Sequence, residues 1–350
     1  MKKASIYFYL MVFLLFSVAK TDAQKIGEWI SYLPYQSGKT VTQSETKVYY
    51  GTEWSILQVD KEDFSTERMS KVDGLSDIGI DEIAYDIYKS QLVIAYSNGN
   101  IDILKGDRIF NLPNIKLNTD LTGNKTINDI HISDNRIYLS TGFGLVTISS
   151  DDLLFGFTTF TDIPINDAVT FNNQIYIATD EGVYFAPIDG SQNLIDFSLW
   201  KLIDNNFGLP ILYESTGVSV FQEKLYFIAE DILYQLEGNG IIEIWPSGSS
   251  NASVSFLSSE GSNLMIGVTG QEGRGDILFY NGNDFVINGR DCSDRIQDII
   301  EDQFGRVWYA DEFEGFRSAS SFKEDCQIMN INSPFSHKVS DISLKNDNIY

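Results

Sequence analysis

A short phrase recurs along the whole 350-residue chain and constrains its fold more than any other feature. Residues 127–147 (INDIHISDNRIYLSTGFGLVT) and residues 165–185 (INDAVTFNNQIYIATDEGVYF) align without a gap. The core of the phrase is a polar turn followed by an aliphatic–aromatic run, and variants of this run begin at Lys47, Gln91, Arg136, Gln174, Lys224, Asn263, Arg306 and Asn348. Their spacing averages about 43 residues, and a period in the forties indicates a repeat architecture.

Each repeat has the same internal order. An apolar run comes first, then an Asn/Asp-rich turn, then the aliphatic–aromatic run. A short loop ending in glycine follows, as at Gly144 and Gly182, where a hairpin residue needs positive φ. A third strand and a longer polar stretch lead to a fourth run, such as residues 197–203 (FSLWKLI). This composition is typical of strands and turns, and no stretch of helical length follows the first twenty residues.

Four short antiparallel strands per repeat predict an all-β fold, namely a seven-bladed β-propeller of four-stranded antiparallel blades. The aliphatic–aromatic runs are apolar on both faces, as expected for a blade that is packed between two neighbours. A β-sandwich also has evenly spaced strands, but the fixed period and the repeated phrase favour the propeller. The blades are expected to begin near positions 41, 79, 127, 165, 217, 253 and 296.

The repeats also predict the domain organisation. Residues 24–338 should form the propeller, and residues 339–350 should be the truncated start of a further blade or of a second propeller. We therefore expect the natural protein to continue beyond Tyr350. Residues 29–35 (WISYLPY) resemble an orphan fourth strand, which could complete the blade at residues 296–320 or one encoded beyond Tyr350.

The N-terminus has the features of an export signal. Lys2 and Lys3 give a basic start, residues 6–18 are apolar, and Ala23 offers a small residue at the cleavage position. The apolar run is too short for a membrane span, and no cysteine follows it as a lipoprotein anchor would require. We expect residues 1–23 to be a signal peptide and the mature chain to be exported, between the periplasm and the outer-membrane cell surface of a Gram-negative bacterium.

The chain is strongly acidic, with a net charge of −24. Removing residues 1–23 takes away three lysines and one aspartate, which makes the net charge −26. Such a surface repels nucleic acid and anionic membranes. It serves solubility, or it binds Ca²⁺ or basic partners. Cys292 and Cys326 are the only cysteines. An oxidising compartment permits a disulfide between them, and their separation in sequence leaves both the disulfide and two free thiols open.

The sequence offers little for catalysis. His131 and His337 are the only histidines and belong to different repeats, and no nucleophile elbow, phosphate loop or dinucleotide fingerprint is present. We therefore predict that the protein is not an enzyme, has no catalytic, cofactor-binding or metal-binding residues, and needs no cofactor. Asp129 and Asp167 recur at one repeat position and are echoed by Asp341. Repetition favours a structural carboxylate that caps local N–H groups at a turn or strand end over a glycosidase pair.

The five tryptophans could bind sugar on a propeller face, but at strand positions they more often pack between blades. They are Trp29, Trp54, Trp200, Trp245 and Trp308. We name no ligand-binding residue from the sequence.

Three stretches resemble two-component regulator propeller repeats. Residues 72–77 (VDGLSD), followed by IDEIAYD, resemble their DGL-S phrase. Residues 301–308 (EDQFGRVW) resemble the D-x-x-G-x-x-W phrase, and residues 279–282 (FYNG) resemble the Y-D-G hairpin. These motifs identify repeats and imply no functional residue.

The chain is also similar to the N-terminal propeller of the PorZ family of type IX secretion. The similarity lies in residues 26–35 (IGEWISYLPY), 48–52 (VYYGT) and 73–76 (DGLS), together with the export signal and the seven repeats. It implies two seven-bladed propellers and a small C-terminal β-domain that acts as a secretion signal. It further implies a non-enzymatic role in the outer-membrane attachment complex with the sortase PorU and the proteins PorV and PorQ, and delivery of anionic lipopolysaccharide to the sortase.

Three functional hypotheses follow. The first is a PorZ-like scaffold that binds protein partners and anionic lipopolysaccharide. The second is the glycan-sensing periplasmic ectodomain of a hybrid two-component regulator, which would later cross the membrane and carry a kinase. The third is an exported carbohydrate-active propeller enzyme, which would need converging carboxylates or a His or Tyr constellation on one face.

Overall fold

The fold is taken from a computed structural model, which describes residues 33–121, 123–245, 253–269, 275–287, 294–321, 324–329, 344–345 and 348–349. The expected signal peptide, Trp29, Cys292, His337 and Asp341 lie outside these residues. The expectations about the signal peptide and the disulfide therefore stay predictions. The propeller belongs to the unit Leu33–Tyr350.

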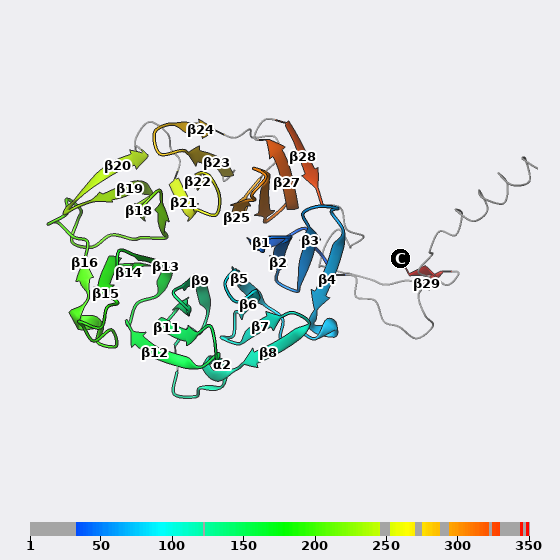
Figure 1. The fold of residues 1–350 in the computed structure, drawn as a ribbon, viewed down its shortest axis with the longest axis horizontal. Helices are drawn as coiled ribbons and strands as arrows, with labels where there is room; N and C mark the ends of the chain where they lie inside the picture. The colour runs from blue at the N-terminus through cyan, green and yellow to red at the C-terminus, as the bar shows by residue number, and fades with distance from the viewer. Residues whose placement is uncertain are drawn as a thin grey trace, which may run out of the picture. The chain divides into compact units, whose positions relative to one another are not determined.

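Seven four-stranded antiparallel sheets follow one another along the chain and form the blades of a propeller (Figure 1). The first strands are β1 (Gly38–Gln43), β5 (Ile80–Asp86), β9 (Ile127–Ser133), β13 (Ile165–Phe171), β17 (Val218–Phe221), β21 (Ser253–Ser258) and β25 (Ile296–Glu301). The second strands are β2 (Lys47–Thr52), β6 (Gln91–Tyr96), β10 (Arg136–Thr141), β14 (Gln174–Thr179), β18 (Lys224–Ala229), β22 (Leu264–Thr269) and β26 (Val307–Asp311). These positions confirm the predicted fold class and blade starts.

The third strands are β3 (Ser55–Asp60), β7 (Ile101–Lys105), β11 (Gly144–Ser149), β15 (Gly182–Pro187), β19 (Ile232–Glu237), β23 (Gly275–Tyr280) and β27 (Gly315–Ser321). The outer strands are β4 (Thr66–Ser70), β8 (Arg108–Leu112), β12 (Phe155–Phe160), β16 (Lys201–Leu202), β20 (Gly240–Trp245), β24 (Phe285–Ile287) and β28 (Glu324–Ile328). Blades 1 to 7 are β1–β4 through β25–β28. First strands of adjacent blades contact one another around the ring, so they are the innermost strands.

Short helical turns lie between the strands. They are η1 (Lys71–Asp73), α2 (Asn114–Leu117) and η2 (Phe197–Leu199). The expected fourth strand at residues 197–203 is mostly wrong, because the first three of these residues form η2 and only Lys201–Leu202 pairs with β15. Two more short strands, β29 (Leu344–Lys345) and β30 (Asn348–Ile349), pair where the start of a further blade is expected. Within the described ranges, no helix is long and apolar enough to span a membrane.

The repeated turn chemistry explains the recurring phrase. Asp134 and Asn135, between β9 and β10, have φ values of 48° and 64°. Asn172 and Asn173, in the equivalent turn of blade 4, have φ values of 49° and 60°. Positive φ at both central residues defines the tight hairpin turn that Asn and Asp tolerate best. Gly144 has φ 147°, and a Cβ there would meet the Thr159 carbonyl oxygen at 2.0 Å, so glycine is required.

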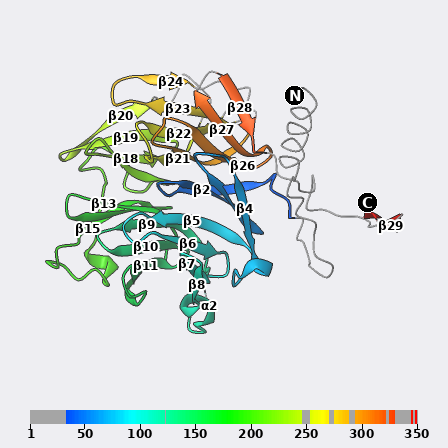
Figure 2. The same cartoon turned by 45° about the vertical axis from the view of Figure 1, so that its right-hand side comes forward.

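The core is divided among the interfaces between blades. Each of the seven clusters of buried apolar residues found in the described part of the chain joins two adjacent blades. All six residues of β6 are buried, as predicted for a strand that is packed on both faces. Figures 1 and 2 show the blades side by side around the ring. The hydrophobic effect therefore acts across every interface, including the one that joins the last blade to the first.

The ring closes by packing blade 7 against blade 1, and blade 7 has its own fourth strand, β28. Tyr50 stacks on Phe316 at a centroid distance of 4.5 Å. Tyr50 also donates a hydrogen bond of 2.9 Å to the Tyr35 carbonyl. Tyr35 is buried in this interface but lies outside the strands. β28 occupies the fourth-strand position of the blade at residues 296–320. Residues 29–32 lie outside the described residues, so the role expected for residues 29–35 stays a prediction.

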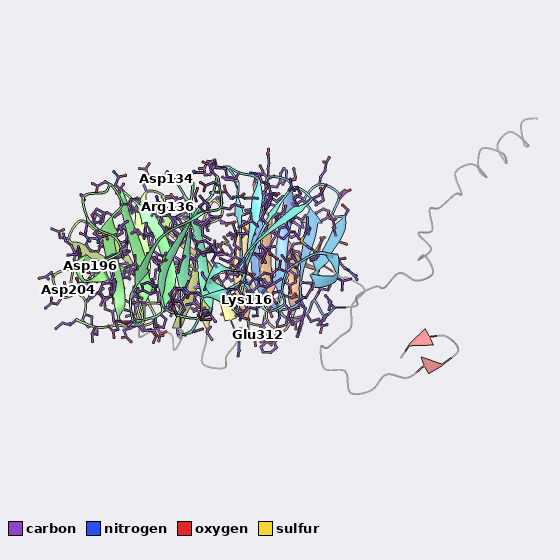
Figure 3. The ribbon with its side chains drawn as sticks, turned by 90° about the horizontal axis from the view of Figure 1, so that it is seen from below. Lys116, Asp134, Arg136, Asp196, Asp204 and Glu312 are labelled. Atoms are coloured by element: carbon purple, nitrogen blue, oxygen red, sulfur yellow. The ribbon has the colours of Figure 1, made fainter. Side chains whose placement is uncertain are left out.

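The propeller has two distinct faces, seen edge-on in Figure 3. Asp134 and Arg136 lie at the turn between the first and second strands of blade 3, on one face. Lys116, in α2, and Glu312, in a hairpin between second and third strands, lie on the other. We call the first the turn face and the second the hairpin face.

Candidate functional site: the central channel and its mouth

The innermost strands of all seven blades line a central channel of about 410 Å³. Four carboxylic acids project from the wall at one repeat position, the third residue of the innermost strand: Glu82, Asp129, Asp167 and Asp298. In each of these strands the register shifts immediately before the acid, which marks a β-bulge. A bulge re-aims the side chain that follows it, so the local irregularity places the acids in the channel.

The acids tie each blade to the next through the backbone. Asp298 Oδ2 accepts a hydrogen bond of 2.7 Å from the Val41 amide of blade 1. Asp167 Oδ2 accepts one of 2.8 Å from the Val218 amide of blade 5. Asp129 accepts from the Ala168 amide of blade 4. These bonds satisfy amides at the channel wall, which gives the acids a structural role.

Burial raises the pKa of every acid in this set. The pKa of Asp167 rises to about 7 and that of Asp298 to about 6, mainly because burial disfavours the charged form. Burial, followed by the charge of neighbouring acids, also raises the pKa of Glu82 and Asp129 well above the usual range. The wall therefore holds protons near neutral pH.

Asp129 and Asp167 form a carboxyl pair. Asp129 Oδ2 is buried, and no hydrogen-bond donor of the described residues reaches it. The Asp129 side chain hydrogen bonds with that of Asp167. Two carboxyl groups can share a hydrogen bond only when one carries a proton, so we infer that the pair holds one proton between its two members.

His131 lies in the same wall but is held as a hydrogen-bond acceptor. Its Nε2 accepts a bond of 3.1 Å from the Thr170 amide in blade 4 and lies 3.0 Å from Thr170 Oγ1. An accepting Nε2 is unprotonated, and burial lowers the pKa of His131 to about 4. The nitrogen that could bind a metal is therefore engaged, and the histidine is neutral at physiological pH.

A groove of about 850 Å³ opens on the turn face. It is lined by turns of blades 1, 2, 6 and 7 and shares Ile132 and Glu260 with the channel, so the groove is the mouth of the channel. Glu260 hydrogen bonds with Gln43, and burial raises its pKa to about 7. Glu260 is exposed and lines the groove.

Lys61 forms the base of the groove between blades 1 and 7. It is only 8% exposed, and its pKa is lowered by burial. Its ammonium donates to Gln43 Oε1 at 2.8 Å, the Ser44 carbonyl at 2.7 Å and Gln303 Oε1 at 2.9 Å. All three N–H donors of the Lys61 ammonium are satisfied within the protein, so none of them is free to bind a ligand.

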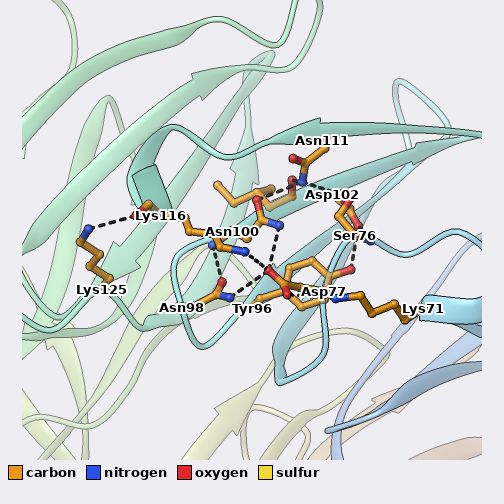
Figure 4. A network of polar contacts seen from close by, with 11 residues as sticks. Lys71, Ser76, Asp77, Tyr96, Asn98, Asn100, Asp102, Asn111, Lys116 and Lys125 are labelled. Atoms are coloured by element: carbon orange, nitrogen blue, oxygen red, sulfur yellow. Dashed lines mark hydrogen bonds and ion pairs between the residues drawn. The ribbon is translucent and has the colours of Figure 1, made fainter. Parts of the chain in front are cut away.

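A second polar network explains the DGL-S stretch, and Figure 4 shows it. Asp102 is fully buried and accepts hydrogen bonds from the Ser76 amide at 2.8 Å and Tyr96 Oη at 2.7 Å. Asp77 accepts from Asn98 at 2.9 Å, Asn100 at 3.2 Å and Lys116. Burial opposes ionisation of Asp77, but these donors outweigh it and lower its pKa to about 2. The network anchors the link between blades 1 and 2, with its polar groups paired internally.

The structure brings Asp129 and Asp167 together in the channel wall, which their repetition in the sequence did not predict. The prediction of an N–H-capping carboxylate is confirmed, but its place at a turn or strand end is wrong, because both residues lie within strands and bond to the next blade. Four residues of the channel and its mouth were not predicted from the sequence, namely Glu82, Asp298, Glu260 and Lys61. Aligning IDEI, INDI, INDA and IQDI across the repeats would have identified the first two.

The tryptophans in strands mostly pack, as predicted. Trp308 is fully buried and stacks on Phe64 of blade 1 at 6.0 Å. Trp245 meets Phe285 of the next blade edge-on at 5.3 Å. Trp200 is buried in the cluster that joins blades 3 and 4, whereas Trp54 is partly exposed in a hairpin of the hairpin face.

Comparisons with known proteins agree with this architecture. Residues 48–201 match the family model of the PorZ N-terminal β-propeller domain of the type IX secretion system. No curated protein sequence matches the chain. The structure of PorZ from Porphyromonas gingivalis, described as an essential bacterial surface component of that system, is 22% identical, with a TM-score of 0.76 over 93% of this chain and 42% of PorZ.

Two other solved structures are similar at lower identity. The extracellular domain of a putative one-component system from B. thetaiotaomicron is 12% identical, with a TM-score of 0.51 over 83% of this chain and 46% of that one. The WD40 propeller of Doa1 is 12% identical, with a TM-score of 0.57 over 81% of this chain and 92% of that one. The chain spans less than half the length of the PorZ structure that it matches. The family match of residues 48–201 and the seven-bladed architecture together show that this chain is similar to the N-terminal β-propeller of PorZ.

Proposed function

We propose that this protein is an exported component of a type IX secretion system that acts as a non-enzymatic binding platform in the outer-membrane attachment complex. The match of residues 48–201 to the PorZ propeller family carries the proposal. The partners would be a PorU-like sortase and PorV-like and PorQ-like proteins, together with anionic lipopolysaccharide. In this proposal residues 1–23 are the signal peptide, residues 24–338 the first propeller and residues 339–350 the start of a second.

The chemistry of the channel supports a binding role over catalysis. A glycosidase needs one free carboxylate and one free acid on either side of a bond. Here Asp167 and Asp298 accept hydrogen bonds from backbone amides, and the side chain of Asp129 is engaged with that of Asp167. Groups that hold the wall together in this way are not free to transfer protons to a substrate.

The net charge of the chain favours protein partners over anionic lipopolysaccharide as direct ligands. The chain carries a net charge of −24, so the direct approach of an anionic lipopolysaccharide is electrostatically unfavourable. Bridging divalent cations or a basic part of a partner would have to offset this repulsion. We therefore expect lipopolysaccharide binding to depend on Ca²⁺ or on the sortase.

The test uses the complete mature protein, immobilised, with the purified sortase and purified anionic lipopolysaccharide, each with and without Ca²⁺. Saturable sortase binding supports the proposal. Absence of binding to the sortase and to millimolar lipopolysaccharide under every condition refutes it.

The alternative is a glycan-sensing ectodomain of a hybrid two-component regulator. It is favoured by the DGL-S stretch and by the shared propeller fold of the B. thetaiotaomicron extracellular domain. Reading the gene downstream of the Tyr350 codon separates the two. A second propeller with a small β-domain supports the secretion component, and a membrane span with a histidine kinase supports the sensor.

A further inference from the structure

Large apolar residues are exposed at two turns around the groove on the turn face. Ile87 and Tyr88, in the turn between β5 and β6, are 63% and 78% exposed. Phe304, in the turn between β25 and β26, is 74% exposed and follows Gln303, which lines the groove. Exposed aromatic and aliphatic side chains around a hollow mark contact surfaces, because their burial by a partner is favourable.

The same turn can be compared among the blades, because each blade has one between its first and second strands. The equivalent turn has Glu45 and Thr46 at its tip in blade 1, Asp134 and Asn135 in blade 3, Asn172 and Asn173 in blade 4, and Gln222 and Glu223 in blade 5. Polar residues therefore suit this turn structurally. The apolar tips in blades 2 and 7 are not required by the fold, and they stand at the two blades that flank blade 1 over the groove.

The groove itself is acidic. Its acidic and basic lining residues are Glu45, Lys61, Asp86 and Glu260. The Lys61 ammonium is satisfied by three internal acceptors. Asp86 is buried and accepts from the amides of Tyr88 and Lys89 at 3.0 Å each. Glu45 and Glu260 remain exposed to the groove, with the acids of the channel beneath them.

We propose that this groove binds a polypeptide segment that presents a lysine or arginine to Glu260, with neighbouring apolar side chains packed on Tyr88 and Phe304. The inference rests on the proposed binding role and specifies the chemistry of the protein partner. The negative field of the chain attracts a cation and repels an anionic glycan. The exposed apolar residues at the turns of blades 2 and 7 can pack against aliphatic side chains. A neutral sugar would leave Ile87 and Phe304 without an apolar surface to pack against.

The test measures fluorescence anisotropy of three labelled twelve-residue peptides with the full chain. They alternate Leu with Lys, Leu with Glu, and Ser with Lys. We expect the Leu/Lys peptide to bind most tightly, the Ser/Lys peptide about tenfold more weakly, and the Leu/Glu peptide not at all. Increasing the salt concentration should weaken the Leu/Lys complex, because charge steers and holds it.

Variants locate the site. The double variant Tyr88→Ala/Phe304→Ala should weaken binding of the Leu/Lys peptide by about tenfold, and Glu260→Gln by about fivefold. Leu154→Ala and Glu237→Gln are the matched controls, because both residues are exposed on the turn face in other blades. They should bind like the unaltered protein. All of these side chains are exposed, so the thermal midpoint should stay within a degree or two of the unaltered value.

Two results would overturn the inference. One is equal weakening by the control variants, which would indicate a diffuse charge effect. The other is binding of lipopolysaccharide that Tyr88→Ala/Phe304→Ala abolishes, while the Leu/Lys peptide does not bind. Repeating the sortase measurement with the same variants separates the two proposals. Sortase binding that the groove variants leave unchanged, with no peptide binding, would leave the platform role intact and remove the groove from it.

Discussion

Replacing Asp167 by asparagine should make the protein more stable near neutral pH. The pKa of Asp167 is raised from 3.8 to about 7, first by burial. A group with a raised folded-state pKa contributes stability at low pH, and that contribution is lost as the pH rises from about 4 to about 7. In Asp167→Asn the amide oxygen can still accept from the Val218 amide, and the amide nitrogen can donate to Asp129. The variant therefore imitates the protonated acid at every pH.

The magnitude follows from the width of this pH window. The folded chain keeps a proton across about three pH units over which the unfolded chain loses it, and each unit corresponds to about 1.4 kcal/mol. The ceiling is therefore about 4 kcal/mol. Asp167 shares its proton with Asp129, and water reaches the channel, so we expect about half of this, about 2 kcal/mol at pH 7.5. At pH 4.5 the variant and the unaltered protein should be equally stable.

Urea unfolding followed by tryptophan fluorescence at pH 4.5, 6 and 7.5 measures the difference. His131 has a lowered pKa and acts in the opposite direction, but it is present in both proteins and cancels in the comparison. Asp134→Asn, at an exposed turn position that suits asparagine, is the control and should change stability equally at all pH values. The reasoning is refuted if Asp167→Asn is less stable than the unaltered protein at pH 7.5, or if the difference does not change with pH.

Three further predictions concern packing and polar contacts. In Gly267→Ala the new Cβ would lie 2.1 Å from a Phe256 ring carbon, so we expect a loss of about 2 kcal/mol in urea unfolding, and Phe256→Ala in the same chain should remove most of it. Lys61→Met should cost about 3 kcal/mol, because Gln303 and two other acceptors lose a charged donor between blades 1 and 7; an unchanged unfolding midpoint would contradict this. Asp77→Asn should cost about 2 kcal/mol at pH 7 and less than about 0.5 kcal/mol at pH 2, because the lowered pKa of about 2 gives stability that is lost as the pH falls from about 4 through about 2. Thermal unfolding at both pH values tests this prediction.

The fold could be predicted in detail because its signals are local. Backbone geometry at single positions selects particular residue types, as in the positive-φ turn at Asn172 and Asn173 and the hairpin glycine Gly144. These residue types can be recognised directly in the sequence. The length of the fourth strand of blade 4 was overestimated, because residues 197–203 are apolar enough to form a strand throughout, whereas β16 has only two residues. The burial of Trp200, whose indole donates to the Leu194 carbonyl at 3.2 Å, is achieved instead by a turn of 3₁₀ helix.

The site could be predicted only in part because its partners are distant in sequence. The repetition of Asp129 and Asp167 was visible, but their partners were not. Asp298 bonds to Val41, 257 residues away, only because the ring closes there. The acidic groove likewise depends on turns of blades 1, 2, 6 and 7, which meet only in the closed ring. Local patterns contain no information about which turn tips face one another.

The channel and the groove together predict how binding should depend on pH. Glu260 at the mouth has a pKa of about 7, and Asp298 below it has a pKa of about 6. Both acids are charged at pH 8 and largely neutral at pH 5, whereas His131, with a pKa of about 4, is neutral at both. The Leu/Lys peptide should therefore bind about tenfold more tightly at pH 8 than at pH 5 at equal ionic strength. Glu260→Gln should reduce this ratio to about twofold. An equal affinity at both pH values would show that the cation does not reach these acids, and the groove would then bind through Tyr88 and Phe304 alone.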